Sequence, residues 1–267
     1  MIANNKYLKQ FNFNKKIIFI IGGSGLIGKE VVKNFLSLGA KVINFDQKKS
    51  LNKNNKLIYE KFLIEEYESE QYNFKHYVKK YGCPDIFINT SYPRTKDWSQ
   101  NSFMNVNIQS YKKNINLHLN SYCWISKEIA NFMIKFNKKG SVILMNSIYG
   151  IRAQNLNFYK DTKMSDNMTY SIIKGGITNY IKQLSSFYSS KGIRFNSVVA
   201  GGLYGHVAGS TNVQNKKFLK RYSDKCPLKR LGYAKEIANV IIFLSSEASS
   251  YVNGSNLVVD GGISAII

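Results

Sequence analysis

Proline, cysteine and long apolar runs are scarce in this chain of 267 residues. Its three prolines argue against a multidomain protein with many linkers. The three cysteines lie far apart in no CxxC pair, and the three histidines show no ligand spacing, so we expect neither a disulfide framework nor a metal site. The apolar run Ile17–Ile21 is too short for a signal peptide or a membrane span. These features favour a cytoplasmic protein without membrane association.

Acidic residues are also few: 16 stand against 38 lysines and arginines, which gives a net charge of +22. Such a charge can indicate nucleic-acid binding. Here the lysines are scattered among asparagines along the whole chain, as expected for a solvated surface. We therefore expect no specific nucleic-acid partner, although the positive field would favour an anionic ligand.

Short apolar runs alternate with longer amphipathic stretches after a polar lead-in at residues 1–14. This alternation predicts βαβ units and a parallel sheet covered by helices on both faces. Residues 15–267 are accordingly expected to form a single α/β, doubly wound Rossmann-like domain with about seven strands, including the substrate cleft. Strands are expected at 16–21, 41–45, 57–62, 85–89, 141–146, 193–199 and 256–259. Helices are expected at 26–38, 68–81, 108–136, 169–189 and 234–245.

A glycine-rich loop follows the first expected strand and leads directly into a helix. Glycines allow a tight turn here and let the backbone approach a pyrophosphate at the positive end of the helix. The loop predicts a dinucleotide site formed by Gly22, Ser24, Gly25, Leu26, Ile27 and Gly28.

Asp46 ends the second expected strand, 18 residues beyond Gly28. An acid at this place accepts hydrogen bonds from the adenosine ribose and repels a 2′-phosphate. The sequence therefore favours NAD(H), with NADP(H) still possible because Lys48 and Lys49 follow closely.

Tyr170 and Lys174 are four residues apart and share one face of an expected helix. A nearby cation favours the ionised phenol, which could then exchange a proton with an oxygen undergoing oxidation or reduction. Taken singly, this pair could equally be a chance pattern on a solvated helix face.

Together with the glycine loop, Asn89, Asn116 and Ser147, this pair resembles the short-chain dehydrogenase/reductase family from about Lys15 to the C-terminus. The resemblance implies that Tyr170 is the general acid/base and that Ser147 binds the reacting oxygen. It implies that Lys174 lowers the pKa of Tyr170 and holds the nicotinamide ribose, while Asn116 supports a proton-relaying water chain. It also implies cofactor contacts by Tyr170 and Lys174 themselves and by Asn89, Thr90, Ser91, Gly201, Gly202 and Leu203.

Three departures from the family pattern indicate which members of the family the chain resembles most. The glycine spacing is typical of the extended branch, but only 93 residues follow Lys174, too few for its added lobe. Tyr92 replaces a small residue. Ser147 and Tyr170 are 23 positions apart, which adds a basic loop at about 152–168. These motifs resemble the flagellin-modification dehydrogenases found with surface-glycan genes. The residues expected to contact the substrate are Arg94, Tyr149, Arg152 and Tyr159.

The sequence thus predicts an NAD(P)-dependent oxidoreductase of a carbohydrate: a sugar, sugar phosphate or nucleotide sugar. One alternative is a 3-oxoacyl or small-ketone reductase, which would need an apolar trough near 202–213. Another is a non-catalytic dinucleotide-sensing protein on the same fold. The resemblance implies a homodimer or homotetramer, and spare apolar area for it is expected at Ile115, Leu119, Tyr122, Ile129, Phe132, Ile173, Ile177, Tyr180, Ile181 and Leu184.

Overall fold

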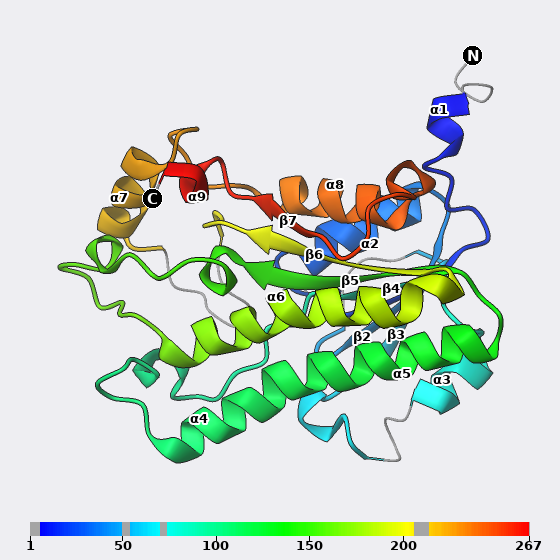
Figure 1. Ribbon diagram of the computed structural model, residues 1–267, viewed down its shortest axis with the longest axis horizontal. Helices are drawn as coiled ribbons and strands as arrows, with labels where there is room; N and C mark the ends of the chain where they lie inside the picture. The colour runs from blue at the N-terminus through cyan, green and yellow to red at the C-terminus, as the bar shows by residue number, and fades with distance from the viewer. Residues whose placement is uncertain (1–5, 50–53, 70–73, 206–213, 267) are drawn as a thin grey trace.

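A computed structural model describes residues 6–49, 54–69, 74–205 and 214–266. Within these ranges seven strands form one sheet in the order β3-β2-β1-β4-β5-β6-β7 (Figure 1). All neighbouring strands are parallel. The strands are β1 (Ile17–Ile21), β2 (Lys41–Asp46), β3 (Leu57–Lys61), β4 (Ile86–Asn89), β5 (Gly140–Ser147), β6 (Ile193–Ala200) and β7 (Asn256–Val259). The predicted seven-stranded parallel sheet is confirmed, and each strand end agrees to within one residue.

Helices cover both faces of this sheet (Figure 1). One face carries α2 (Gly28–Ser37) and α8 (Ala234–Ser245); the other carries α3 (Phe74–Tyr81), α4 (Ile108–Asn114), α5 (Ser121–Lys135) and α6 (Met168–Tyr188). The remaining helices are α1 (Lys6–Lys9), α7 (Lys216–Lys225) and α9 (Ile263–Ile266). The predicted doubly wound arrangement is therefore present.

The uninterrupted apolar sequence of β1 follows from its position between two hydrophobic layers. Successive side chains of a strand point to opposite faces of the sheet. Phe19 and Ile21 pack in the core beneath α5 and α6, whereas Ile18 and Ile20 pack in the core beneath α2 and α8. A strand buried on both faces must be apolar at every position, so it lacks the alternation of a half-exposed strand.

The helix expected at 108–136 contains a π-helical segment, Ile115–Asn120, between α4 and α5. A π-turn closes hydrogen bonds over five residues in place of four, so it shifts which side chains face the core. Within the segment Leu117 and His118 are buried, whereas Asn116 and Asn120 are exposed. This local change of register determines which side chain reaches the interior of the protein.

Three other expectations need correction. The lead-in is not simply polar, because it contains α1 and because the Phe13 ring packs edge-on against Phe35, 5.0 Å between centroids. Helix α7 was not predicted, since its sequence is strongly polar and Tyr222 is its buried residue. Helix α3 begins at Phe74 and not at residue 68; residues 70–73 lie outside the described ranges.

The apolar side chains expected to supply subunit contacts are used mostly inside the chain. Six of them are buried in the core on the α5–α6 face: Tyr122, Ile129, Ile173, Ile177, Ile181 and Leu184. The exposed apolar residues of these helices are instead Trp124, Ile134, Ile172 and Phe187. Subunit contact through α5 and α6 stays a prediction.

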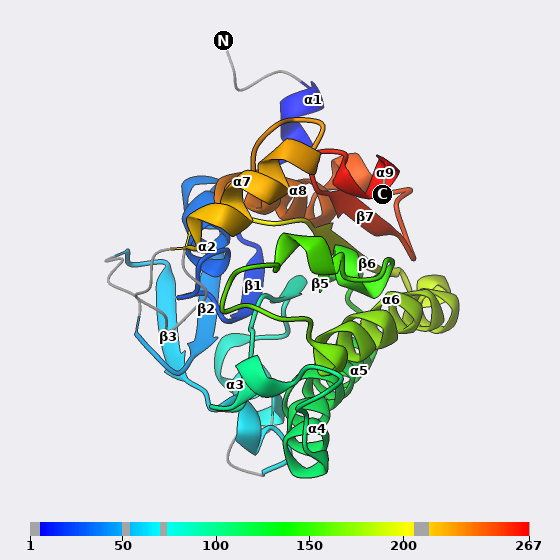
Figure 2. The same cartoon turned by 90° about the vertical axis from the view of Figure 1, so that its left-hand side faces the viewer.

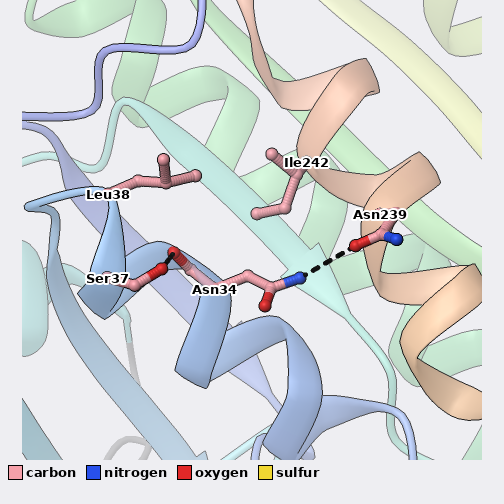
Figure 3. Close-up of a pocket in the computed structure, with 5 residues that line it drawn as sticks. All are labelled: Asn34, Ser37, Leu38, Asn239 and Ile242. Carbon is pink, nitrogen blue, oxygen red and sulfur yellow. Dashed lines mark hydrogen bonds between the residues drawn. The ribbon is translucent and has the colours of Figure 1, made fainter. Parts of the chain in front are cut away.

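A shallow pocket lies between α2 and α8 (Figure 3). Its lining residues are Asn34, Ser37, Leu38, Asn239 and Ile242, and the Asn34 side-chain amide donates to Asn239 Oδ1 at 3.3 Å. None of the predicted site residues lines it. In the described part of the chain, no helix combines the length and hydrophobicity needed to cross a bilayer.

Replacing Phe13 by alanine tests whether the lead-in belongs to the core. Phe13 is 2% exposed, so its truncation should lower the free energy of unfolding by about 3 kcal/mol. Phe103→Ala is the matched control: its ring is 73% exposed, and its loss should change stability by less than ~0.5 kcal/mol. Urea unfolding measures both, and equal effects would show that Phe13 does not contribute to the core.

Candidate active site

Most of the predicted site residues lie where the strands end. The carboxyl ends of parallel strands share one edge of the sheet, and strand order reverses between β1 and β4. Figure 2 looks onto this edge, with α4, α6 and α7 around it. The segments that follow β1, β4, β5 and β6 therefore meet there.

The glycine loop after β1 is shaped by close backbone contacts. Gly22 has φ +81°, which favours glycine, and a Cβ at Gly28 would lie 2.1 Å from the Gly22 carbonyl oxygen. Helix α2 begins at Gly28, so the loop delivers its backbone amides to the start of a helix. This geometry suits a bound pyrophosphate.

Two side chains of β2 hold this loop. The Gly23 amide donates to Asn44 Oδ1 at 2.9 Å, and the Ser24 amide donates to Asp46 Oδ2 at 2.9 Å. Asp46 was predicted from the sequence, but Asn44 was not. An asparagine between the apolar residues Ile43 and Phe45 of a buried strand was the available signal, since buried polar groups need partners.

The segment after β4 borders the same loop. Asn89 is fully buried; its Oδ1 accepts from the Ser91 hydroxyl at 2.6 Å, while its Nδ2 has no partner among the described residues. The Thr90 hydroxyl donates to the carbonyl oxygens of Ile21 and Gly22, at 3.0 and 3.1 Å. An unsatisfied buried donor beside the glycine loop indicates an external acceptor.

The segment after β6 borders the glycine loop on the side opposite the segment after β4. The Gly202 amide donates to the Tyr222 hydroxyl of α7 at 2.6 Å. Leu203 pairs with Gly232 in an isolated bridge. A Cβ at Gly205 would lie 2.9 Å from Leu26, so this segment touches the glycine loop directly. The chain from Gly201 to Leu203 thus approaches the predicted dinucleotide site.

Ser147 and helix α6 meet through a close packing contact. Ser147 ends β5 and its Oγ accepts from the Tyr149 amide at 3.3 Å. A Cβ at Gly150 would lie 2.5 Å from the Lys174 carbonyl oxygen, so glycine lets α6 approach this turn. The Asn167 side chain caps α6 by accepting from the Tyr170 amide at 2.8 Å. Tyr170 is thereby brought to Ser147, whose hydrogen bond lowers its pKa.

Lys174 is 2% exposed. Its Nζ donates to the Met145 carbonyl oxygen at 3.0 Å and lies 3.2 Å from His118 Nε2. The Nζ also lies 5.5 Å from the centre of the Tyr170 ring. None of the ion pairs found in the described ranges includes Lys174, and burial lowers its pKa to about 7.

Burial also determines the protonation of Tyr170. Loss of solvation raises the pKa of its phenol above the ordinary value, and the hydrogen bond from Ser147 offsets only part of this rise. With its pKa raised, the phenol is protonated at neutral pH. The Nζ of Lys174 lies over the ring face, and the lowering of the phenol pKa that the resemblance implies for Lys174 stays a prediction.

The side chain of Asn116 hydrogen-bonds to residues other than Lys174, and its expected support of a water chain stays a prediction. Its side chain is exposed, and its Oδ1 accepts from the Tyr67 hydroxyl and the Asn120 amide, both at 3.0 Å. The π-helical segment directs His118 inward, two residues after Asn116, and it is His118 that contacts Lys174.

These residues fit a nicotinamide dinucleotide. The glycine loop, the amides at the start of α2 and the unpaired Asn89 amide supply donors for phosphate and amide groups. Asp46 supplies a carboxylate at the end of β2 for ribose hydroxyls. Among the described residues, no group of histidine, cysteine or acidic side chains is arranged to hold a metal ion.

The chain is similar to several known proteins over nearly its whole length. A family model described as enoyl-(acyl carrier protein) reductase matches residues 24–264. The chain belongs to the short-chain dehydrogenase/reductase family. It is therefore an oxidoreductase acting on CH–OH groups, and its fold is one that binds NAD(P).

Three proteins similar to this dehydrogenase/reductase carry names that indicate different roles. The post-translational flagellin modification protein A of Campylobacter coli is 30% identical over 92% of this chain and 97% of its own. A 3-oxoacyl-(acyl-carrier-protein) reductase of Buchnera aphidicola is 29% identical over 93% of this chain and 97% of its own length. A short-chain dehydrogenase of Leptospira borgpetersenii with bound NAD+ is 27% identical, covers 98% and 97%, and superposes with a TM-score of 0.85.

Aromatic rings surround the Tyr170 ring. Tyr92, Trp98 and Tyr149 each pack against it edge to face, with centroid distances of 5.7, 6.0 and 6.3 Å. The Trp98 Nε1 donates to the Tyr92 hydroxyl at 3.1 Å, which fixes both rings. Trp98 was not predicted from the sequence, because it follows Tyr92 by six positions and belongs to no motif.

The tentative substrate residues fall into two groups. Tyr149 and Tyr159 join through their hydroxyls at 2.8 Å, and Arg94 lies 5.2 Å from the centre of the Tyr92 ring, so these three adjoin the aromatic surroundings of Tyr170. Arg152 is exposed. The 152–168 loop is fixed by Gln154, whose Nε2 donates to the Ser171 hydroxyl at 2.8 Å.

Gly28→Ala tests the glycine loop as the dinucleotide site. The added Cβ would collide with the Gly22 carbonyl oxygen, so affinity for NADH should fall at least about tenfold, or ~1.4 kcal/mol. Gly175→Ala is the control, because the nearest atom to its Cβ lies 4.0 Å away. NADH fluorescence titration of the folded variants provides the measurement, and unchanged affinity in Gly28→Ala would place the dinucleotide elsewhere.

Proposed function

We propose that this dehydrogenase/reductase interconverts a hydroxyl and a ketone on a sugar, sugar phosphate or nucleotide sugar in surface-glycan synthesis. The observation that carries the chemistry is the convergence of Ser147, Tyr170 and Lys174 at the edge of the sheet. It also argues against a non-catalytic dinucleotide-sensing protein, which would have no use for a buried phenol and amine beside a serine.

Proton transfer is assigned to Tyr170. In the reductive direction the phenol O–H bond breaks and Tyr170 Oη gives its proton to the carbonyl oxygen of the substrate. In the oxidative direction the ionised phenolate receives the proton of the substrate hydroxyl. When bound, the nicotinamide supplies or accepts the hydride. The Ser147 hydroxyl, which influences the pKa of Tyr170, is assigned to hold the reacting oxygen. The raised pKa of Tyr170 suits donation to a carbonyl oxygen at neutral pH.

The surroundings of Tyr170 support a carbohydrate substrate. Rings of Tyr92, Trp98 and Tyr149 offer apolar surface for the C–H face of a sugar, while the hydroxyls of Tyr149 and Tyr159 offer hydrogen bonds. Arg94 supplies a positive charge for a phosphate or carboxylate. The similarity to the flagellin modification protein agrees with this substrate class.

A 3-oxoacyl or small-ketone reductase is the second candidate, because the family model and the Buchnera relative carry reductase names of acyl-carrier chemistry. The apolar trough expected for it at 202–213 lies largely outside the described residues, which omit 206–213. A panel of nucleotide sugars, sugar phosphates and 3-oxoacyl thioesters, assayed by NADH absorbance, separates the two. Turnover of the thioesters alone would exclude the carbohydrate assignment.

Subunit contacts are proposed through the exposed apolar residues Trp124, Ile172 and Phe187, giving a homodimer or homotetramer. NAD(H) is the proposed cofactor. Asp46 is held at the end of β2 with Oδ1 accepting from the Lys48 amide at 3.0 Å, so its carboxylate is fixed near the loop. A fixed negative charge there repels a 2′-phosphate.

Tyr170→Phe should lower kcat by about 10²- to 10⁴-fold, because it removes the proton carried by the phenol. Binding of NADH should remain nearly intact. Tyr188→Phe is the matched control in the same helix: its hydroxyl donates to Asn131 at 2.9 Å, away from Ser147. Steady-state kinetics on any substrate from the panel gives the result, and substantial activity in Tyr170→Phe would exclude the mechanism.

Asp46→Ser should raise the ratio of kcat/KM for NADPH to that for NADH by at least about tenfold. The substitution removes a repulsion of ~1.4 kcal/mol between the carboxylate and the 2′-phosphate. Asp224→Asn, at an exposed acid of α7, should leave the ratio unchanged. Paired kinetics with the two cofactors measures it. A ratio unaffected by Asp46→Ser means that this carboxylate does not select the cofactor.

A further inference from the structure

The imidazole of His118 is fully buried beside Lys174. Its ring is 0% exposed and packs against Tyr122 and Tyr92, with centroid distances of 5.1 and 5.6 Å. These two rings come from α5 and from the segment after β4, so His118 is confined on two sides. The π-helical segment directs it inward. Nothing in the mechanism above uses it.

Hydrogen-bonding rules determine its tautomer. When Lys174 is protonated, its ammonium only donates, so the imidazole nitrogen 3.2 Å from its Nζ then accepts. The proton of neutral His118 therefore lies on Nδ1. That nitrogen has no partner among the described residues, which leaves its N–H for a water molecule.

The arrangement also accounts for the donors of Lys174. One N–H is directed to the Met145 carbonyl oxygen and a second to His118 Nε2. The third remains available for the side on which Tyr170 lies. A flexible four-carbon side chain is thus fixed at its end by two acceptors from different elements.

We propose that His118 is a positioning residue for Lys174: its neutral imidazole, protonated on Nδ1, accepts a hydrogen bond on Nε2 and so keeps the ammonium charged and directed toward Tyr170. The titratable side chains facing the imidazole are Lys174 from α6, Tyr122 from α5 and Tyr92 after β4. Burial and the adjacent Lys174 keep the pKa of His118 well below its usual range. The ring therefore serves as an acceptor and not as a second cation.

Nitrogen NMR of protein labelled with [¹⁵N]histidine tests the tautomer without any substrate. The chain has three histidines, and spectra of His118→Gln and His76→Gln assign the relevant signals. We expect His118 to stay neutral with Nδ1 protonated between about pH 5 and 8. A protonated Nε2, or a cationic ring in that range, would overturn the proposal. Because this result needs no turnover, it is independent of the proposed substrate and reaction.

Steady-state kinetics then test whether His118 positions Lys174 for turnover. This second experiment rests on the proposed function. His118→Leu removes the acceptor, so kcat should fall at least about tenfold with little change in KM. The alkaline limb of the pH profile should move to lower pH, because an ammonium without its acceptor loses its proton more easily. His118→Gln places an amide oxygen near the position of Nε2 and should restore most of kcat and the profile.

His76→Gln is the matched control, at an exposed histidine of α3, and should behave as the wild type. Thermal unfolding confirms that each variant is folded. Equal losses in His118→Leu and His118→Gln, or an alkaline limb that does not move in His118→Leu, would show that the ring only fills space. If no substrate in the panel is turned over, the proposed function fails while the NMR result stands.

Discussion

Burial of the Lys174 amino group is the constraint on which the rest of the site depends. Moving a lysine out of water disfavours its charge strongly, and among the described residues no carboxylate compensates it. The compensation comes from the Met145 carbonyl oxygen, from His118 Nε2 and from the faces of two tyrosine rings. Each partner belongs to a different element, so β5, α5, α6 and the π-helical segment must be correctly placed together.

The packing of α6 explains how this placement is reached. Gly150 allows the helix to approach the turn after β5 so closely that any side chain there would strike the Lys174 carbonyl group. Tyr170, one turn earlier and next to the Asn167 cap, is then held beside Ser147. The same edge of the sheet carries the glycine loop and Asn89. Proton chemistry and dinucleotide binding are therefore adjacent because parallel strands end together.

Much of the fold could be predicted because it depends on local patterns. The apolar run Ile17–Ile21 and the glycines after it identify a buried strand and its loop without long-range information. Tyr170 and Lys174 were found by helical spacing. Phe13 and Tyr222 were missed because each is a single buried aromatic residue in a polar stretch, and only tertiary contacts show its burial.

Asn116 shows what the sequence pattern could not predict at the site. An asparagine in the expected helix satisfied the family motif, but a π-turn changes the helical register, and it exposes Asn116 while burying His118. Periodicity of 3.6 residues cannot reveal such an insertion. The rise in the pKa of Tyr170 was likewise inaccessible, because it depends on how deeply the phenol is buried. Contacts between elements decide both features.

The central claim is that Lys174, held in its buried position, supports reduction of the substrate with Tyr170 as the proton donor. Transfer of deuterium from NADH labelled at nicotinamide C4 tests this claim most directly. With a substrate from the panel, mass spectrometry should find the label on the product carbon for the wild-type protein. Lys174→Met, which keeps the buried aliphatic chain but has no amino group, should give almost none. Undiminished deuterium transfer by Lys174→Met would contradict the account.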